Sequence, residues 1–303
     1  MNDLPENRIF KICTLGESFG RLKIYIVIPA HNEAEFLEQT LTSLVNQSLK
    51  PARLVVVDDQ SNDETAEIAE KFAAQNEWIS LVRTSSSRDH LPGSKVIKAF
   101  QKGLETLDEK YEVLCKFDAD LIFPQNYLET IAAHFTADLK TGMCGGFCHV
   151  FSEENWVLEN LTGKDHIRGA LKAYRKQCFK DIGGLRPSMG WDTVDELLAQ
   201  YHGWKITTDS SLKVKHLRPT GATYGKAAKL KQGEAFYKLR YGITITLIAA
   251  AKLASRKGNP GFFVDYLKGY FKARHQKMPF LVDKKEGAFI RRLRYKKMVS
   301  KLF

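Results

Sequence analysis

Residues 24–33 read IYIVIPAHNE, a run of β-forming apolar residues followed by Pro29 and polar side chains. A strand without polar residues is covered on both faces, as the strands of parallel sheets are. Apolar residues then recur at helical spacing, at Phe36, Leu37, Leu41, Leu44 and Val45. The pattern therefore predicts a buried strand at Ile24–Ile28 and an amphipathic helix after it.

This strand-and-helix unit recurs along the first half of the chain. Further strands are predicted at Leu54–Val57, Ile79–Val82 and Val113–Phe117. Helices are predicted after Asn62 or Asp63, either of which could cap the helix, and at Lys95–Leu107 and Asn126–Phe135. The alternation predicts an α/β protein with a mostly parallel central sheet flanked by helices.

The second half is less regular. We expect strands at Met143–Phe151 and Leu212–Lys215, and helices at Gly169–Asp181 and Asp192–Tyr201. Beyond about Tyr224 the pattern is helical and basic. We therefore divide the chain into an N-terminal extension (1–21), an α/β domain (22–225) and a basic helical C-terminal extension (226–303).

The net charge of +11 on 303 residues is unevenly distributed. The extension holds 20 Lys and Arg against 4 Asp and Glu, a balance of +16, which leaves −5 for the first 225 residues. Basic amphipathic helices with aromatic residues can lie on anionic membranes, and the alternative is a helical cap with a solvated basic face. No nucleic-acid-binding motif accompanies the charge, so we expect no nucleic-acid partner.

The longest apolar run, Ile243 to Leu253, is shorter than the roughly 20 residues that cross a bilayer. The N-terminus shows no signal-peptide pattern. We expect a cytoplasmic protein, peripheral on the inner face of the cell membrane if the extension binds lipid. The five cysteines are expected to be reduced core residues, and we do not expect Cys144 and Cys148 to form a zinc site.

Polar residues gather where the predicted strands end, and in parallel sheets ligands bind at that edge. Asp118 and Asp120 follow the fourth strand with one residue between them, so the turning chain can aim both carboxylates at one ion. Hard divalent ions prefer such oxygen ligands, so the pair predicts a site for Mg²⁺ or Mn²⁺. The alternative is two solvated loop aspartates.

The ends of the first two strands carry Asn32, Glu33, Asp58 and Asp59. We predict that they contact a nucleotide, and the alternative is that they cap the turns and helices that begin there.

Gly93 and Lys95 open the third helix, where backbone and a cation could approach a diphosphate. Arg88 and His90 would be further donors just before it. The alternative is that Lys95 is merely exposed to solvent.

Asp192 follows a loop and begins a predicted helix. A carboxylate beside a bound acceptor can take the proton of the attacking hydroxyl, so we predict that Asp192 is a general base, with Asp195 as the alternative base. As a structural element Asp192 would be a helix N-cap. Trp191 either stacks on a sugar or fills the core. His216 alone is more typical of a structural histidine.

In this order the segments resemble those of the family 2 inverting glycosyltransferases, which have a GT-A fold with a Rossmann-like nucleotide-binding half. The resemblance covers roughly Leu22 to Arg218. It rests on IVIPAHNE at 26–33, VVDDQSND at 56–63, FDAD at 117–120, and GGL at 183–185 leading to GWD at 190–192. Each segment is modest alone, but the ordered set is specific.

The resemblance implies a role for individual residues. A nucleotide pocket would lie at Pro29, Asn32, Glu33 and Asp58 or Asp59. A metal on the donor diphosphate would bind Asp120, with Asp118 contacting ribose or metal, and Asp192 would be the base. His216 becomes a metal or diphosphate ligand, and Trp191 and Asp195 would lie towards the acceptor.

Two departures from the family pattern matter. Trp191-Asp192 stands where the family often has Glu-Asp, and Gln101 stands where an Asn is usual. The Gln-x-x-Arg-Trp sequence of processive synthases is absent from the chain, which predicts a non-processive transfer.

The expected reaction is a metal-dependent, inverting transfer of a single sugar from a nucleotide-diphosphate sugar to a glycan or lipid-linked acceptor hydroxyl. The product would be a polysaccharide, a glycolipid or another cell-surface glycan. Two rivals remain: a nucleotidyltransferase, which would release pyrophosphate, and a degenerate nucleotide-sugar-binding scaffold.

Overall fold

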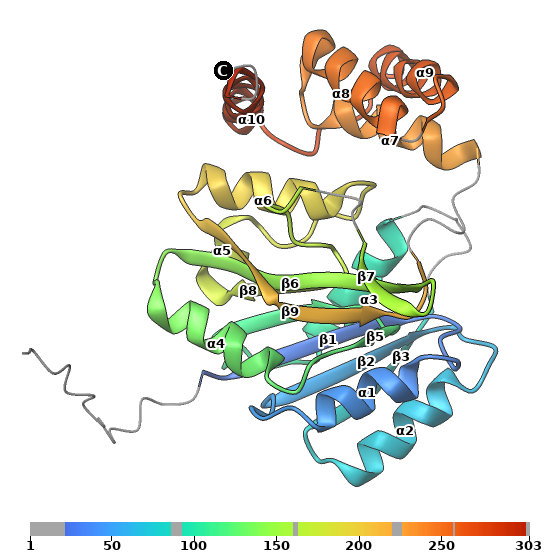
Figure 1. Cartoon of the computed structure of the whole chain (residues 1–303), viewed down its shortest axis with the longest axis vertical. Coiled ribbons are helices and arrows are strands. Elements are labelled where there is room, and N and C mark those ends of the chain that lie inside the picture. Colours follow the sequence, from blue (N-terminus) through green and yellow to red (C-terminus); the bar gives the residue numbers. More distant parts are fainter. Residues whose placement is uncertain (1–21, 86–92, 160–162, 220–225, 257, 301–303) are drawn as a thin grey trace, which may run out of the picture.

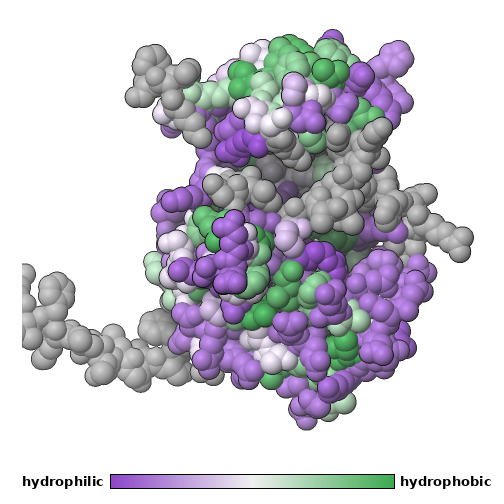
Figure 2. All heavy atoms as spheres, turned by 45° about the vertical axis from the view of Figure 1, so that its right-hand side comes forward, coloured by the Kyte–Doolittle hydropathy of each residue, from purple (hydrophilic) through white to green (hydrophobic). Residues whose placement is uncertain are grey.

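The computed structural model describes residues 22–85, 93–159, 163–219, 226–256 and 258–300. They form two lobes, a lobe built on a central sheet and a lobe of helices placed over one side of it (Figure 1). The expected N-terminal extension, and with it Cys13, lies outside the described residues, as do Arg88 and His90. Figure 2 shows a largely hydrophilic surface on the sheet lobe and hydrophobic residues gathered on the far end of the helical lobe.

The first half of the sheet confirms the predicted strand-and-helix repeat. Strands β1 (Ile24–Ala30), β2 (Arg53–Asp59), β3 (Ile79–Thr84) and β4 (Val113–Phe117) pair in parallel in the order β3-β2-β1-β4. Helices α1 (Leu37–Val45) and α2 (Thr65–Gln75) lie on one side of the sheet and α3 (Ser94–Glu105) on the other (Figure 1). A Cβ atom on Gly103 of α3 would lie 2.6 Å from the side chains of Val27 and Val57, so only glycine permits this close packing.

The second half is a mixed sheet. Its elements are β5 (Leu121–Ile122), α4 (Tyr127–Ala137), β6 (Thr141–Ser152), β7 (Asn155–Leu158), β8 (Leu171–Arg175), α5 (Lys176–Asp181), α6 (Trp191–Tyr201) and β9 (Lys205–His216). Strand β8 runs antiparallel between β4 and β6, while β9 runs parallel to β6 and antiparallel to β5. The sheet therefore continues from β4 through β8. The start of α6 lies beside β4, where Lys116 Nζ is 5.2 Å from the centre of the Trp191 ring.

One sequence prediction was wrong in this half. The segment Gly169–Asp181 was expected to be a helix, but its central residues Leu171–Arg175 form β8 and only Lys176–Asp181 is helical. All four residues from Leu171 to Tyr174 are buried, and the lysine among them, Lys172, is 0% exposed. Lys172 interrupts the apolar run that would have indicated a buried strand. Its charge partners are more than twenty residues away in sequence, so the local pattern did not indicate that this lysine is buried.

The helical lobe comprises α7 (Lys226–Lys238), α8 (Gly242–Arg256), α9 (Gly261–His275) and α10 (Lys284–Val299), in agreement with the predicted helical extension. Helix α7 crosses α9 at glycines: a Cβ on Gly233 would lie 1.9 Å from the Tyr266 carbonyl oxygen, and one on Gly269 would lie 2.0 Å from that of Leu230. Helix α10 packs against α6, where the rings of Tyr201 and Phe289 lie 5.5 Å apart.

The cysteines and the longest helices can both be compared with the sequence predictions. Cys115, Cys144, Cys148 and Cys178 are buried free thiols, as predicted. None of the helices in the described ranges is long and apolar enough to span a bilayer.

Candidate active site

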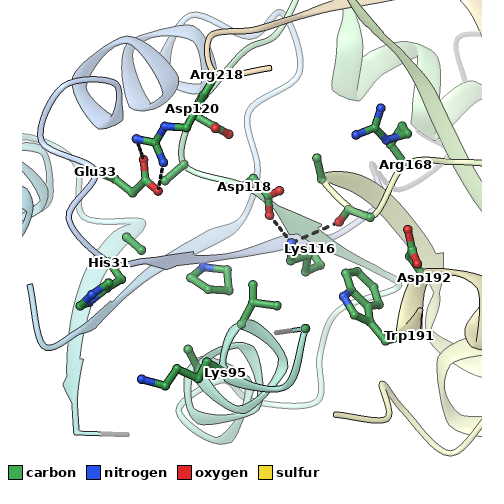
Figure 3. Close-up of a pocket in the computed structure, with 18 of the residues that line it drawn as sticks. His31, Glu33, Lys95, Lys116, Asp118, Asp120, Arg168, Trp191, Asp192 and Arg218 are labelled. Carbon is green, nitrogen blue, oxygen red and sulfur yellow. Dashed lines mark hydrogen bonds and ion pairs between the residues drawn. The ribbon is translucent and has the colours of Figure 1, made fainter. Parts of the chain in front are cut away.

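A cavity of about 490 Å³ opens at the carboxyl ends of β1, β2 and β4. The start of α3, the start of α6 and the residues after β9 complete its wall (Figure 3). Predicted site residues in its lining are Pro29, Glu33, Asp59, Lys95, Asp118, Asp120, Trp191, Asp192 and His216. The structure thus brings together side chains that the sequence separates by almost two hundred residues.

Asp118 is held by a buried lysine at the floor of this cavity. Lys116 is only 2% exposed, and its Nζ donates to Asp118 Oδ1 and, at 3.2 Å, to the Gly169 carbonyl oxygen. The two residues lie two positions apart at the end of β4, so their side chains point to the same face. One oxygen of Asp118 is therefore committed to Lys116, and the carboxylate is oriented into the cavity (Figure 3).

Asp120 has a different environment. Its Oδ1 is buried and accepts no hydrogen bond from any described residue, and its Oδ2 lies 3.6 Å from His216 Nε2. Nδ1 of His216 lies 3.0 Å from Glu159 Oε2. A buried carboxylate oxygen without a donor is costly unless a cation binds it. Asp120 and His216 therefore fit a divalent metal, with Asp118 beside them, and Glu159 orients the imidazole from behind.

Glu33 faces Asp120 across an arginine that the sequence did not indicate. Arg218 donates to both carboxylate oxygens of Glu33, at 3.1 and 3.0 Å. Burial raises the pKa of Glu33 to about 7, against the opposing charge of Arg218 and with a further contribution from Asp120. Glu33 is thus a paired residue of the cavity wall rather than an exposed one.

Asn32 and Asp58 serve the loops beside the cavity. Asn32 Oδ1 accepts from the Asn62 amide at 2.8 Å, and Asp58 Oδ1 accepts from the Ser61 amide at 3.2 Å. Neither residue lines the cavity, whereas Asp59 does. The side-chain oxygens of Asn32 and Asp58 hold the β1–α1 and β2–α2 loops in shape, and their contact with a nucleotide stays a prediction. Asp63, one of the two expected caps, accepts from the amide of Thr65, the first residue of α2.

The start of α3 lies against the loop that precedes α6. Gly93 has a positive φ of 77°, and a Cβ there would lie 2.8 Å from the Ser188 carbonyl oxygen, so any other residue would be strained and crowded. This close approach places Lys95 on the cavity wall opposite Trp191 (Figure 3). Gln101, the departure from the family pattern, donates to the Leu185 carbonyl oxygen at 3.1 Å and ties α3 to the same region.

Asp192 lies in the first turn of α6, after Gly190, and 31% of its side chain is exposed to the cavity. His166 Nε2 lies 3.7 Å from Asp192 Oδ2, and His166 Nδ1 lies 2.9 Å from Glu196 Oε2. Burial acts to raise the pKa of Asp192, but His166 and Lys172 outweigh it and hold that pKa at about 2. Burial acts to lower the pKa of His166, and the carboxylates of Asp192 and Glu196 raise it to about 9. Asp192 is therefore an accessible, ionised carboxylate.

Trp191 and Asp195 lie behind Asp192. Trp191 is 7% exposed, with the Nζ atoms of Lys116 and Lys172 at 5.2 and 5.7 Å from its ring, so it packs between two buried cations while one edge lines the cavity. Asp195 is 2% exposed and accepts from Lys172 at 2.8 Å and from Tyr174 at 2.5 Å. It does not line the cavity, and its carboxylate anchors α6 to β8.

Several residues of this site were missed by sequence reasoning: Lys116, Glu159, His166, Arg168, Lys172 and Arg218. A signal existed for Lys116, since it interrupts an otherwise apolar strand, but none existed for Lys172, because its segment was predicted to be a helix. The others lie outside the strand-end motifs: Arg168 and Arg218 line the cavity, and Glu159 and His166 lie behind it, against His216 and Asp192.

A family model described as glycosyl transferase family 2 matches residues 25–181, more than half of the chain. A probable glycosyltransferase of Bacillus subtilis, YdaM, is 33% identical over 152 residues, which cover 48% of this chain and 34% of YdaM. The cholesterol galactosyltransferase of Borreliella burgdorferi is 27% identical over 164 residues, 50% of this chain and 42% of that protein. The chain is thus matched to less than half the length of these curated relatives.

Among solved structures, the mannosyltransferase PcManGT of Pyrobaculum calidifontis, in complex with GDP-Man and Mn²⁺, covers 95% of this chain and 82% of its own, with a TM-score of 0.55 and 15% identity. At that identity the likeness establishes the fold. The parallel strands that carry Asp59, Asp118 and Asp120 to one cavity lie within the residues that the family model matches. The chain belongs to glycosyl transferase family 2, and its sheet lobe has the GT-A fold.

Proposed function

We propose that this protein transfers a single sugar from a nucleotide-diphosphate sugar to an acceptor hydroxyl, with inversion of configuration. One observation carries the proposal. A single cavity has Asp120 on one side and the accessible carboxylate of Asp192 on another (Figure 3). The Oδ1 atom of Asp120 is buried and accepts a hydrogen bond from none of the described residues. Charge develops at the leaving group and at the attacking hydroxyl during such a transfer, and the cavity offers a suitable group for each.

The donor is proposed to bind on the side formed by β1, β2 and β4. Pro29 and Asp59 would contact the base and ribose, with Asn32 and Asp58 keeping the flanking loops in shape and Glu33 paired to Arg218. Lys95 would approach the diphosphate from the start of α3. Asp120, His216 and the second oxygen of Asp118 would hold Mn²⁺ or Mg²⁺, which supplies charge stabilisation for the departing diphosphate.

The transfer itself is proposed to be a direct displacement. Asp192 accepts the proton of the acceptor hydroxyl while the hydroxyl oxygen forms the new bond to the anomeric carbon. The bond from that carbon to the diphosphate breaks on the opposite face, and the nucleoside diphosphate leaves with the electron pair. His166 and Lys172, by holding the pKa of Asp192 at about 2, keep the base ionised throughout the physiological pH range.

The acceptor is proposed to be a glycan or a lipid-linked sugar used to build a polysaccharide, a glycolipid or another cell-surface glycan. We further propose that the protein works at the cytoplasmic face of the membrane. Two features support this part: the basic balance of the C-terminal extension and the contact of α10 with α6, the helix that carries Asp192.

A thermal-shift panel of UDP-, GDP- and dTDP-sugars, with and without Mn²⁺, tests the donor site. A ligand that binds only the folded state raises the unfolding temperature, so one nucleotide class should stabilise the protein in a metal-dependent way. Asp120→Ala should abolish that stabilisation, whereas Asp192→Asn should keep it. If no donor shifts the unfolding temperature, the scaffold alternative gains; pyrophosphate release from a nucleoside triphosphate would indicate the nucleotidyltransferase instead.

A further inference from the structure

Helices α8 and α9 expose large apolar side chains on the helical lobe. On α8 these are Ile243, Leu247 and Ile248, between 39% and 43% exposed, and on α9 they are Val264 and Phe271, both 48% exposed. The two helices pack against each other. Figure 2 shows hydrophobic residues gathered on this end of the lobe, away from the sheet. We call these five residues, with the exposed cations Arg256, Lys268 and Arg274 of the same two helices, the α8–α9 face.

The composition of α8 is unusual for a helix that faces water. Residues 242–251 read GITITLIAAA and contain no charge, although five of them are exposed. The opposite side of the helix already packs into the lobe through Ile245, Thr246, Ala250 and Ala254. The outward apolar residues are therefore surplus to the core, and contiguous exposed apolar residues of this kind usually mark an interaction surface.

The exposed cations of α8 and α9 indicate which partner fits this face. Arg256 at the end of α8 and Lys268 and Arg274 on α9 are exposed. The acidic residues nearest in sequence are few: Glu234 is buried and pairs with Lys272 at 3.5 Å, and Asp265 is half-buried. Apolar side chains with exposed cations among and beside them match a bilayer that presents acyl chains beneath anionic headgroups.

We propose that the α8–α9 face docks on an anionic phospholipid surface, lying on the bilayer without crossing it. A second copy of the chain is a poorer match, because apposing two such faces would bring like charges together. A nucleic acid fits less well, because most of the exposed side chains that define this face are apolar. Because α10 of the same lobe packs on α6, docking would hold the sheet lobe and its cavity at the membrane, with the helical lobe between the cavity and the bilayer.

Sedimentation of the full-length protein with vesicles tests this proposal. The wild type should bind vesicles of phosphatidylcholine with phosphatidylglycerol, and bind phosphatidylcholine alone much more weakly. The pair of changes Leu247→Glu and Ile248→Glu should lower the partition coefficient about tenfold or more, because it places two charges in the docked face. Leu139→Glu is the matched control: Leu139 is 75% exposed but lies on the sheet lobe, so its change should leave binding intact.

A second pair, Arg256→Glu with Lys268→Glu, should weaken binding only where the anionic lipid is present. The proposal is overturned if the wild type does not sediment with anionic vesicles, or if the Leu247 and Ile248 changes leave binding unaltered. It is also overturned if those changes convert a dimer to a monomer in analytical ultracentrifugation without lipid, since a second copy would then be the occupant. The metal-dependent donor shift should survive in every variant, so failure here is distinct from failure of the proposed transfer.

Discussion

Two sides of the cavity repeat the same arrangement of side chains. On one side Asp120 faces His216, and His216 faces Glu159, at 3.6 and 3.0 Å. On the other Asp192 faces His166, and His166 faces Glu196, at 3.7 and 2.9 Å. Carboxylate pairs raise the pKa of both histidines to about 9 against the effect of burial.

The two aspartates differ where it matters for chemistry. The side chain of Asp120 is 12% exposed, and its buried Oδ1 has no hydrogen-bond donor among the described residues. The side chain of Asp192 is 31% exposed, and neither of its carboxylate oxygens is both buried and without a hydrogen-bond partner. Burial without a donor suits a cation that binds in the cavity, while exposure suits a base that meets a substrate hydroxyl. The same triad can therefore serve a metal or a base, and the surroundings of the aspartate decide which.

The largest expected effect comes from substitution of Asp192, the proposed base, and it separates this role from that of Asp120. Asp192→Asn should lower the rate of transfer by about 10²–10⁴-fold, since an amide cannot accept the acceptor proton. Release of nucleoside diphosphate from the donor identified by thermal shift measures the rate, and the metal-dependent thermal shift should persist. Near-normal turnover of Asp192→Asn would show that another residue is the base.

The next effect tests whether Glu159 supports metal binding by orienting His216 beside Asp120. Glu159→Gln should weaken Mn²⁺ binding by about 10–100-fold, because a carboxylate behind a ligating histidine fixes its orientation and raises its basicity. Isothermal titration with Mn²⁺ in the presence of UDP or GDP measures this affinity. Glu154→Gln, at an exposed position on the same hairpin, is the matched control. Unchanged Mn²⁺ affinity in Glu159→Gln would remove Glu159 from the metal side.

A smaller effect is expected in the pH dependence of the base side. His166 and Lys172 hold the pKa of Asp192 at about 2, below its ordinary 3.8, so the ionised base and its contribution to stability are lost only as pH falls through about 2. His166→Gln removes one of these cations, so the pKa should rise and the acidic limb of the pH–rate profile should move to higher pH. An unmoved limb would mean that Lys172 and Arg168 lower the pKa of Asp192 without His166.

The sequence predicted the side of the cavity that holds Asp120 better than the side that holds Asp192. The donor side follows from strands that end in carboxylates, because Asp59 ends β2 and Asp118 and Asp120 lie just beyond the end of β4. Fold and family were confirmed, while the roles of the site residues remain predictions.

The base side depends on pairings that no local pattern reports. Lys172 is buried because Asp195 and Glu196 bind it from α6, and that pairing hid β8 from the periodicity argument. His166 and Glu159 reach their aspartates from segments without a recognisable motif. Tertiary charge pairs are thus the part of the site that a single sequence could not supply.

The smallest expected effect concerns the contact between α10 and α6, the helix that carries Asp192. Tyr201 of α6 and Phe289 of α10 form an edge-to-face ring contact at 5.5 Å, which links the helical lobe to the helix that carries Asp192. A double-mutant cycle of Tyr201→Leu and Phe289→Leu, measured by urea unfolding, should give a coupling of about 0.5–1.5 kcal/mol. The same variants should alter the rate of transfer while leaving Mn²⁺ affinity unchanged, because α10 packs on α6, the helix that carries Asp192. Equal losses in transfer and in Mn²⁺ affinity would instead mean that the helical lobe stabilises the whole cavity rather than its base side.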